Sequence, residues 1–490
     1  MKEKTMKNFD IQNIQNELKT IEQGLTQLSD QLWELAETRF EEYQSAAILM
    51  SYLEGEGFAV ENNLAGLPTA FKATFGSGQP VIGILAEYDA LFSLSQEADV
   101  TERKVISGNE NGNGHGCGHH LFGAASVGGA IMVKRYLEST GSAGTVVLFG
   151  CPGEEGGSGK AYMARSGAFD GLDVALAWHP ASVNLVISAS MLANHQIYYQ
   201  FKGRSSHAAA SPHLGRSALD AVELMNVGVN YLREHIIQEA RVHYAVTNSG
   251  GLSPNVVQPN AESLYLIRAP HIKDVKEINA RIDNIARGAA LMTETEVTIQ
   301  FDKACSNVVP NLALEKVIHE TMMACGAPAF GPEDHDYANK FSATLDAQAL
   351  NKDVFMLTLE QNKEVREVIK SLEGKSLCDA VLPHAPSDRI VPGSSDVGDV
   401  SWNVPTAQFA VCCYALGTPA HSWQMVAQGK SSVAHKGMLK AAEIFAAASI
   451  KLLHDPEAIV QAKEEFKARL DGDVYECPIP PEIQPRRMGN

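Results

Sequence analysis

Hydrophobic residues recur every three or four positions near the start of the chain. Ile11, Ile14, Leu18 and Ile21 begin this spacing, and "LWELAETRFEEYQSAAILMSYLEGEG" continues it. A period of about 3.6 residues is typical of an amphipathic helix with one face against a core. The pattern therefore predicts helix over residues 10–55, ending at the glycines that follow.

Short apolar runs come next, and they alternate with helical patterns. "PVIGILAEYDAL", "GTVVLFGCPGEEGG" and "DVALAWHPA" contain runs of apolar residues that end in polar or glycine-rich positions, as buried strands do. "LFGAASVGGAIMVKRYLEST", between the first two, has the small residues of a helix that packs closely on a sheet. This alternation predicts an α/β fold with a mainly parallel or mixed sheet flanked by helices. In such folds, functional sites gather at the carboxyl ends of the strands.

The pattern changes near residue 190. "NHQIYYQFKG", "AESLYLIRAP" and "EVTIQF" alternate apolar and polar residues, and two amphipathic helical patterns separate them. They predict an inserted α+β domain with helices on one face of its sheet. A chain of 490 residues is also too long for one core. We therefore expect the first part of the main domain at 1–190, the insertion at 191–303 and the second part of the main domain at 304–490.

Composition and charge narrow the classes of function. A net charge of −18 argues against nucleic acid or an anionic membrane as a partner, because both are polyanions. No run approaches 18 uncharged apolar residues, and no signal peptide is visible at the N-terminus. The eight cysteines are too sparse for a disulfide framework. We expect a cytoplasmic protein that acts on a small molecule.

One glycine-rich stretch, "NGNGHGCGHHLFGAA", concentrates possible metal ligands before a predicted helix. Cys117 and His119 are one residue apart, and His115 and His120 flank them. Thiolate and imidazole suit Zn, Mn, Co or Ni, and glycine lets the backbone fold around an ion. A solvent-exposed loop that happens to contain histidines is the alternative, and so short a motif does not decide between the two.

Three further candidates follow predicted strands. Glu154 and Glu155 lie in "GCPGEEGGSGK", His179 ends "ALAWHPA", and His421 lies in "CCYALGTPAHSWQ". Taken alone, the glutamate pair is more commonly a solvated turn, and each histidine is more commonly structural than a metal ligand. Together they fall where an open α/β sheet builds its sites. One cysteine, three histidines and one glutamate then make two metal positions with an open coordination site, and the second glutamate is free to move protons.

An ordered series of motifs resembles the amidohydrolase branch of the M20 metallopeptidases. The series is "AEYDAL", "GHGCGHHLFGAA", "PGEEGGSGK", "WHP", "SSHAAASPHLGRSALDA", "SPNVVQPNAESLYLIR", "GSSDVGDVSW" and "GTPAHS". The resemblance implies hydrolysis of the amide bond in an N-acyl amino acid such as p-aminobenzoyl-glutamate. Two alternatives stay open within the family: a dipeptidase for β-alanyl or related dipeptides, and a hydrolase of auxin-type conjugates. A non-catalytic binding or regulatory subunit of a heteromeric hydrolase is the alternative from another class.

The resemblance also implies roles for individual residues. Two divalent ions, Zn or Mn with Co or Ni also possible, would be bound with a bridging cysteine. A metal-bound hydroxide would attack the amide, with Glu154 as general base. Asp89 would support the centre, and Ser395 and Asp396 would line it. The implied metal ligands are Cys117, His119, Glu155, His179 and His421.

The inserted segment resembles the lid, or dimerisation, domain of the family. His207 would stabilise the oxyanion in a neighbouring subunit's site, while Asn255 and Arg268 would hold the substrate's carboxylate. These roles imply a homodimer, or a heteromer with a related subunit. His120 departs from the family, which has Asp or Asn at this position. The roles of His120 and His115 therefore stay open.

Overall fold

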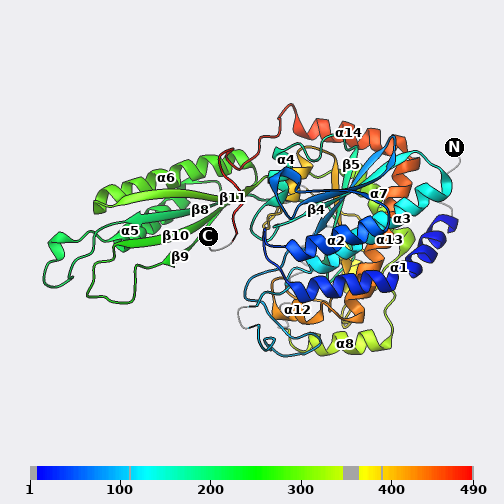
Figure 1. Cartoon of the computed structure of the whole chain (residues 1–490), viewed down its shortest axis with the longest axis horizontal. Helices are drawn as coiled ribbons and strands as arrows, with labels where there is room; N and C mark the ends of the chain where they lie inside the picture. The colour runs from blue at the N-terminus through cyan, green and yellow to red at the C-terminus, as the bar shows by residue number, and fades with distance from the viewer. Residues whose placement is uncertain (1–7, 110–111, 346–362, 388–389, 488–490) are drawn as a thin grey trace.

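The computed structural model describes residues 8–109, 112–345, 363–387 and 390–487. Figure 1 shows a large lobe built around one sheet, and a narrower lobe that extends away from it. None of the described helices combines the length and the apolar character that a membrane span requires.

The large lobe contains a seven-stranded mixed sheet among the described residues. The four central strands β4, β3, β5 and β13 run parallel, while β1, β2 and β6 pair antiparallel at the edges. The predicted α/β fold class is confirmed. In order across the sheet, the strands are β1 (Ala59–Asn62), β2 (Phe71–Ser77), β4 (Gly144–Cys151), β3 (Val81–Glu87), β5 (Val174–Ala181), β13 (Thr406–Cys412) and β6 (Leu185–Ile187).

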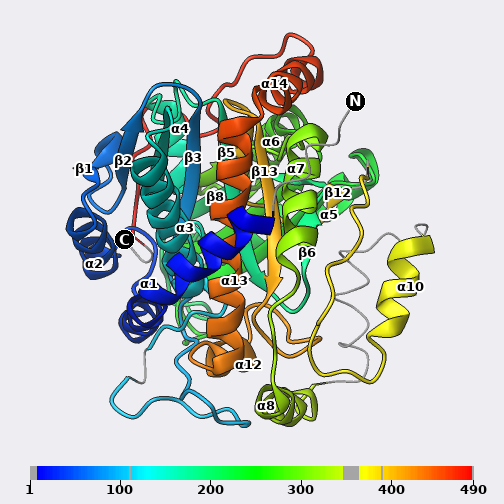
Figure 2. The same cartoon turned by 90° about the vertical axis from the view of Figure 1, so that its right-hand side faces the viewer.

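Helices cover this sheet, and α1, α3 and α13 lie side by side over one face (Figure 2). The small residues of α3 permit this close packing, because a Cβ atom added to Gly129 would lie 2.5 Å from Cβ of Phe445 in α13. Two short strands, β7 (Ser190–Met191) and β12 (Ile390–Val391), pair separately. The helices that the structure describes in this lobe are α1 (Asn8–Leu35), α2 (Tyr43–Gly55), η1 (Leu64–Gly66), α3 (His119–Thr140), α4 (Gly159–Arg165), α7 (Leu312–Cys325), α8 (Pro332–Ser342), α10 (Lys363–Ser371), α11 (Val397–Ser401), α12 (Trp423–Gln428), α13 (Ser432–His454) and α14 (Pro456–Leu470).

The single helix predicted for the start of the chain is wrong, because the chain breaks between α1 and α2. Phe40 has left-handed backbone with φ 60°, and Arg39 turns inward to pair with Asp302 at 3.0 Å. The buried carboxylate of Glu42 accepts hydrogen bonds from the N–H groups of Phe40 and Gly153, both at 2.9 Å. These tertiary contacts stabilise the break between α1 and α2. The hydrophobic periodicity continues across the break, so the sequence pattern does not reveal it.

The narrower lobe has a four-stranded antiparallel sheet in the order β11-β8-β10-β9 and its own hydrophobic cluster. Strand β9 was not predicted, because all its residues but Val242 are exposed at the sheet edge. Strand β11 continues to Cys305, and the domain division at 191 and 303 stays a prediction. The elements are β8 (Ala193–Lys202), η2 (Pro212–Leu214), α5 (Ala218–Leu232), η3 (Arg233–His235), β9 (Arg241–Asn248), β10 (Asn260–Ala269), α6 (Ile272–Thr293) and β11 (Glu296–Cys305).

Candidate metal centre

The structure brings together the five residues predicted as metal ligands. They come from the loop before α3 and the first residue of α3, the loop after β4, the end of β5 and the loop after β13. The possible ligand atoms of Cys117, His119 and His179 lie within 4.8 Å of one another, and so do those of Cys117, Glu155 and His421. Cys117 belongs to both groups. Two adjacent cation positions that share one thiolate are therefore available in a single chain.

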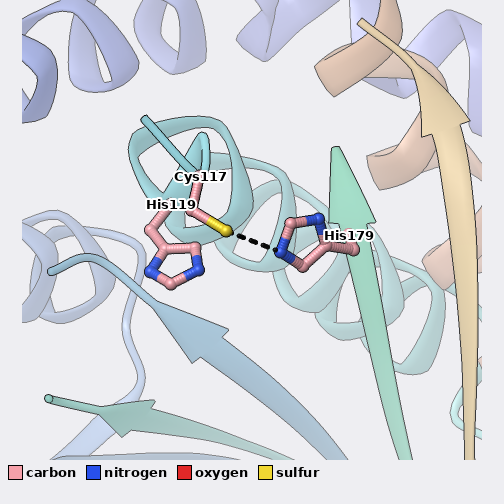
Figure 3. Close-up of side chains that lie close together, drawn as sticks. All are labelled: Cys117, His119 and His179. Atoms are coloured by element: carbon pink, nitrogen blue, oxygen red, sulfur yellow. Dashed lines mark hydrogen bonds between the residues drawn. The ribbon is translucent and has the colours of Figure 1, made fainter. Parts of the chain in front are cut away.

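The glycines of the opening loop let its backbone approach the sheet. Sγ of Cys117 points toward His179 and lies 3.3 Å from its Nε2 atom (Figure 3). Gly118 has a φ of 77°, and a Cβ atom there would lie 2.3 Å from Oη of Tyr414. Nδ1 of His179 donates to the carbonyl of Pro180 at 2.9 Å, which leaves the lone pair of Nε2 facing the cysteine. The loop thus places two donor atoms side by side.

Asp89 orients two of the candidate ligands. Nδ1 of the fully buried His119 donates to Oδ1 of Asp89 at 2.8 Å, and Oδ2 of Asp89 accepts from the backbone N–H of Glu155 at 2.8 Å. Nε2 of His119 lies 3.2 Å from Oε2 of Glu87 but makes no hydrogen bond. A buried imidazole nitrogen without a hydrogen-bond partner fits a metal ligand whose other nitrogen is held by a carboxylate.

The loop after β13 closes the group. His421 has left-handed backbone with φ 58°, and its N–H donates to the carbonyl of Gly116 at 2.8 Å. Its Nε2 atom lies 3.3 Å from Oε1 of Glu155, an oxygen that is buried and makes no hydrogen bond. The unpartnered atoms of His119 and Glu155, with one thiolate and two further imidazoles nearby, form a donor set suited to divalent transition metals.

The neighbouring glutamates differ in proton affinity in the metal-free protein. Burial raises the pKa of Glu154 well above its usual value, and the charges of Glu87 and Asp396 raise it further. Burial would also raise the pKa of Glu155, but its close contact with His421 and the positive charge of the nearby imidazole rings lower it to about 2. Glu155 is therefore ionised while Glu154 retains a proton more readily, the difference expected between a ligand and a proton carrier.

His115 and His120 lie against the helices that cover the sheet. Nε2 of His115 donates to the carbonyl of Leu32 at 2.9 Å, and Nε2 of His120 donates to that of Gly429 at 2.9 Å. Burial lowers the pKa of both rings, to about 4 for His115. Among the described residues, neither belongs to a group able to hold a cation. Both fit neutral, structural histidines.

Arg268 lies where the narrow lobe meets the large one. It is next to last in β10, and its Nη1 atom donates to Oγ of Ser394 at 3.1 Å. Its Nε atom is buried without a hydrogen-bond partner. Ser394 belongs to the same loop as Ser395 and Asp396, so the predicted lining residues and the predicted carboxylate-binding arginine meet at this junction.

His207 and Asn255 lie at the opposite end of the narrow lobe. The N–H of Ala208 donates to the carbonyl of Asn255 at 2.9 Å, and both predicted side chains are exposed. Their loops follow Lys202 and precede Asn260, which pair at the far end of the sheet. Eight residues separate 260 from 268 along β10, about 27 Å at 3.4 Å per residue. The structure therefore does not bring these two side chains to the cluster of their own chain.

Comparison with known proteins agrees with this geometry. The model of the peptidase family M20/M25/M40 matches residues 83–451, which is more than half of the chain. The chain belongs to this family. The predicted resemblance to the M20 metallopeptidases is confirmed, and the protein is a hydrolytic metalloenzyme of the M20 type.

Two relatives and one solved structure illustrate the match. The chain is 48% identical over 463 residues to a subunit of p-aminobenzoyl-glutamate hydrolase from Escherichia coli (strain K12), which covers 94% of this chain and 96% of the relative. It is 29% identical over 459 residues to the Xaa-Arg dipeptidase of Mus musculus, covering 90% and 89%. A dinuclear metal binding peptidase of the M20 family from Bacillus subtilis superposes with a TM-score of 0.53, covering 89% and 99% at 15% identity, which indicates a shared fold.

The sequence patterns missed two charged residues beside the site of this M20 enzyme. Glu87 ends β3, and Lys160 lies in α4 with no exposed surface. Nζ of Lys160 lies 2.6 Å from Oε1 of Glu87 and 2.6 Å from Oδ1 of Asp396. One signal was available, because residues two apart at the end of a strand share a face. Glu87 precedes the predicted supporting residue Asp89 by two positions.

Proposed function

We propose that this M20 enzyme is a dinuclear-metal amidohydrolase that cleaves an N-acyl amino acid, with p-aminobenzoyl-glutamate as the first expected substrate. The convergence of five ligand-type residues beside the carboxyl group of Glu154 carries this proposal. The name of the Escherichia coli relative, at 48% identity over nearly the whole chain, supports the substrate.

The two groups that share Cys117 would each hold one ion. Cys117, His119 and His179 would bind the first, and Cys117, Glu155 and His421 the second. Thiolate and imidazole favour Zn, Co or Ni, whereas the carboxylate also permits Mn. When bound, such ions polarise an amide carbonyl and lower the pKa of water, so that a nucleophile exists at neutral pH.

Glu154 is the proposed general base. Its carboxylate takes a proton from the attacking water and then delivers it to the nitrogen of the leaving amine. The raised pKa of Glu154 supports this role, because a carboxyl group with increased proton affinity can hold the proton before it returns it. Glu155, with its lowered pKa, stays ionised beside His421.

Arg268 is proposed to bind the substrate's carboxylate, because a guanidinium offers a planar pair of donors. His207 and Asn255 are proposed to act in the site of another subunit, where His207 would stabilise the oxyanion. The length of the narrow lobe between these residues and Arg268 supports action across subunits. A homodimer, or a heteromer with a related subunit, follows from this arrangement.

A substrate screen tests the reaction class. The purified chain is stripped of metal, reloaded with Mn²⁺ or Zn²⁺, and offered p-aminobenzoyl-glutamate, Xaa-Arg and β-alanyl dipeptides, and auxin conjugates. We expect metal-dependent release of p-aminobenzoate. Faster cleavage of Xaa-Arg dipeptides would favour the alternative that the Mus musculus relative suggests. No cleavage by the metal-loaded chain, with activity restored by a related subunit, would favour a non-catalytic role.

Substitution of Glu154 by Gln tests the proposed base. We expect unchanged metal content and a fall in kcat of about 10²–10⁴, the usual contribution of general acid–base catalysis. Metal per chain by mass spectrometry and steady-state kinetics measure the two effects. Glu443→Gln is the matched control, since Glu443 is also buried and pairs with Lys440 at 2.6 Å in α13. Near-normal kcat in a fully metallated Glu154→Gln enzyme would remove Glu154 from the mechanism.

A further inference from the structure

Glu87 adjoins the proposed centre but has no part in the mechanism above. It is 2% exposed, and its Oε2 atom lies 3.2 Å from Nε2 of His119. Glu87, His119 and Glu154 form a third group whose possible ligand atoms lie within 4.8 Å of one another. Glu87 reaches this group from β3, a strand that carries none of the five predicted ligands.

Lys160 determines which oxygen of Glu87 is free. Its Nζ atom lies 2.6 Å from Oε1 of Glu87 and 2.6 Å from Oδ1 of Asp396, and its backbone N–H donates to Oδ2 of Asp396 at 2.9 Å. Because Lys160 has no exposed surface, its ammonium group cannot exchange these carboxylates for water. Oε1 of Glu87 is therefore occupied, and Oε2 faces His119.

The charges in this group favour a cation. Two buried carboxylates, those of Glu87 and Asp396, face one ammonium group, that of Lys160, so the remaining negative charge is balanced by a proton on the neighbouring His119 or by a bound cation. A buried charge without compensation is costly. The unpartnered Nε2 atom of His119 lies beside the free oxygen of Glu87. A divalent ion at this point would meet an imidazole nitrogen and a carboxylate oxygen together.

We propose that Glu87 supplies an oxygen ligand to the ion held by Cys117, His119 and His179, and that Lys160 positions this carboxylate. The inference rests on the dinuclear centre proposed above. An oxygen donor added to sulfur and nitrogen donors makes the position harder, which raises its preference for Mn²⁺ over Zn²⁺. Glu87 is then a determinant of metal choice in this chain.

Metal binding by Glu87→Gln in the full-length chain tests the proposal without relying on activity. Metal-free protein is dialysed against buffered Mn²⁺ or Zn²⁺, and bound metal is counted by mass spectrometry. We expect one Mn²⁺ to bind as in the unmodified chain and the other about 10–100-fold more weakly, with a smaller loss for Zn²⁺. Glu443→Gln, at another buried glutamate that pairs with a lysine, should match the unmodified chain. Two Mn²⁺ ions bound by Glu87→Gln with unchanged affinity would overturn the proposal.

Glu87→Asp provides the test if Glu87→Gln does not fold. This variant keeps the charge opposite Lys160 but withdraws the oxygen by one methylene group, so Mn²⁺ affinity should still fall. Unaltered Mn²⁺ affinity in a folded Glu87→Asp chain, judged by circular dichroism, would refute the role of Glu87. A different result would contradict the proposed dinuclear centre itself. In that case the unmodified chain would bind no metal, or Cys117→Ala would still bind two ions.

Discussion

The proposed metal centre and the tip of the narrow lobe both carry residues that the family resemblance implicates, but their surroundings are opposite. At the centre, His119 is fully buried, and Asp89 joins it to the loop of Glu155 through two hydrogen bonds of 2.8 Å. At the tip, His207 is exposed, and its Nδ1 atom accepts from the N–H groups of its own loop at 3.2 and 3.1 Å.

The fold of a single chain positions the residues of the centre. His207 and Asn255 would reach a centre only through movement of the lobe or through a second subunit. The centre is held by loops at the ends of packed strands, so its donor atoms are in place before substrate arrives. His207 and Asn255 have no such support and lie far along the sheet from Arg268. If His207 and Asn255 act as proposed, closure of the lobe or a second subunit must bring them to the centre. Substitutions at the metal centre should therefore remove both bound metal and activity, whereas substitutions at the tip should lower activity and leave metal binding intact.

Cys117→Ala should have the largest effect, because Cys117 alone belongs to both proposed cation groups. We expect loss of both bound ions after dialysis and a fall in activity of more than about 10³-fold, since water is no longer activated. Metal analysis and kinetics measure the change. Cys477→Ala, at a partly buried cysteine in the C-terminal segment, is the control. A Cys117→Ala chain that still binds two ions would show that the two cation positions do not depend on a shared Cys117 thiolate.

His207→Ala should leave metal binding intact and reduce kcat by about 10²–10³, as loss of one oxyanion donor does. If the residue acts across subunits, mixing His207→Ala with Glu154→Gln chains should restore activity. Random exchange makes half of the dimers mixed, each with one intact site, so about a quarter of the normal activity is expected.

The mixing experiment can also contradict the proposal that His207 acts across subunits. If exchanged chains, verified by native mass spectrometry, stay inactive, His207 serves its own subunit and the narrow lobe must close over it. His213→Ala, in the neighbouring exposed η2 turn, controls for general disturbance of the tip. An equal loss of activity in both variants would assign the effect to loop structure instead of the imidazole.

The convergence of the centre followed from the sequence because short, continuous apolar runs identify buried parallel strands. Once "DVALAWHPA" and "GTVVLFGCPGEEGG" are strands of one sheet, their carboxyl ends meet, and His179 and Glu155 come together. The roles of His207 and Arg268 were different in kind. They depended on resemblance, since an exposed histidine and a strand arginine carry no pattern of their own.

Other features were inaccessible because they depend on contacts between distant segments. The break at Arg39 is stabilised by Asp302, 263 residues later, and the helical period shows no trace of it. Lys160 gives no sign in sequence that it is buried between Glu87 and Asp396. His115 and His120 look like ligands until their rings are seen to bond to the carbonyls of other segments.

The smallest expected effect concerns the stability of the narrow lobe in acid. Nδ1 of His195 in β8 donates to Oδ1 of Asn279 in α6 at 2.9 Å. Burial lowers the pKa of His195 from 6.5 to about 4, although the bond to Asn279 raises it. Between these values the unfolded chain binds more protons than the folded one. The lobe therefore loses stability as pH falls from 6.5 toward 4, and is unaffected by this group above 6.5.

His195→Gln should remove this acid sensitivity. At pH 5, 1.5 units below the unfolded value, the shift corresponds to about 2 kcal/mol. Hydrogen exchange of β8 and α6 peptides at pH 7 and pH 5, corrected for intrinsic rates, measures it. His235→Gln, at an exposed position of η3, is the matched control. A variant whose lobe weakens in acid as much as the unmodified chain would show that another group sets the response. Equal stability of the His195→Gln lobe at pH 7 and pH 5 would show that His195, in the core of the lobe, sets the acid response independently of the metal centre.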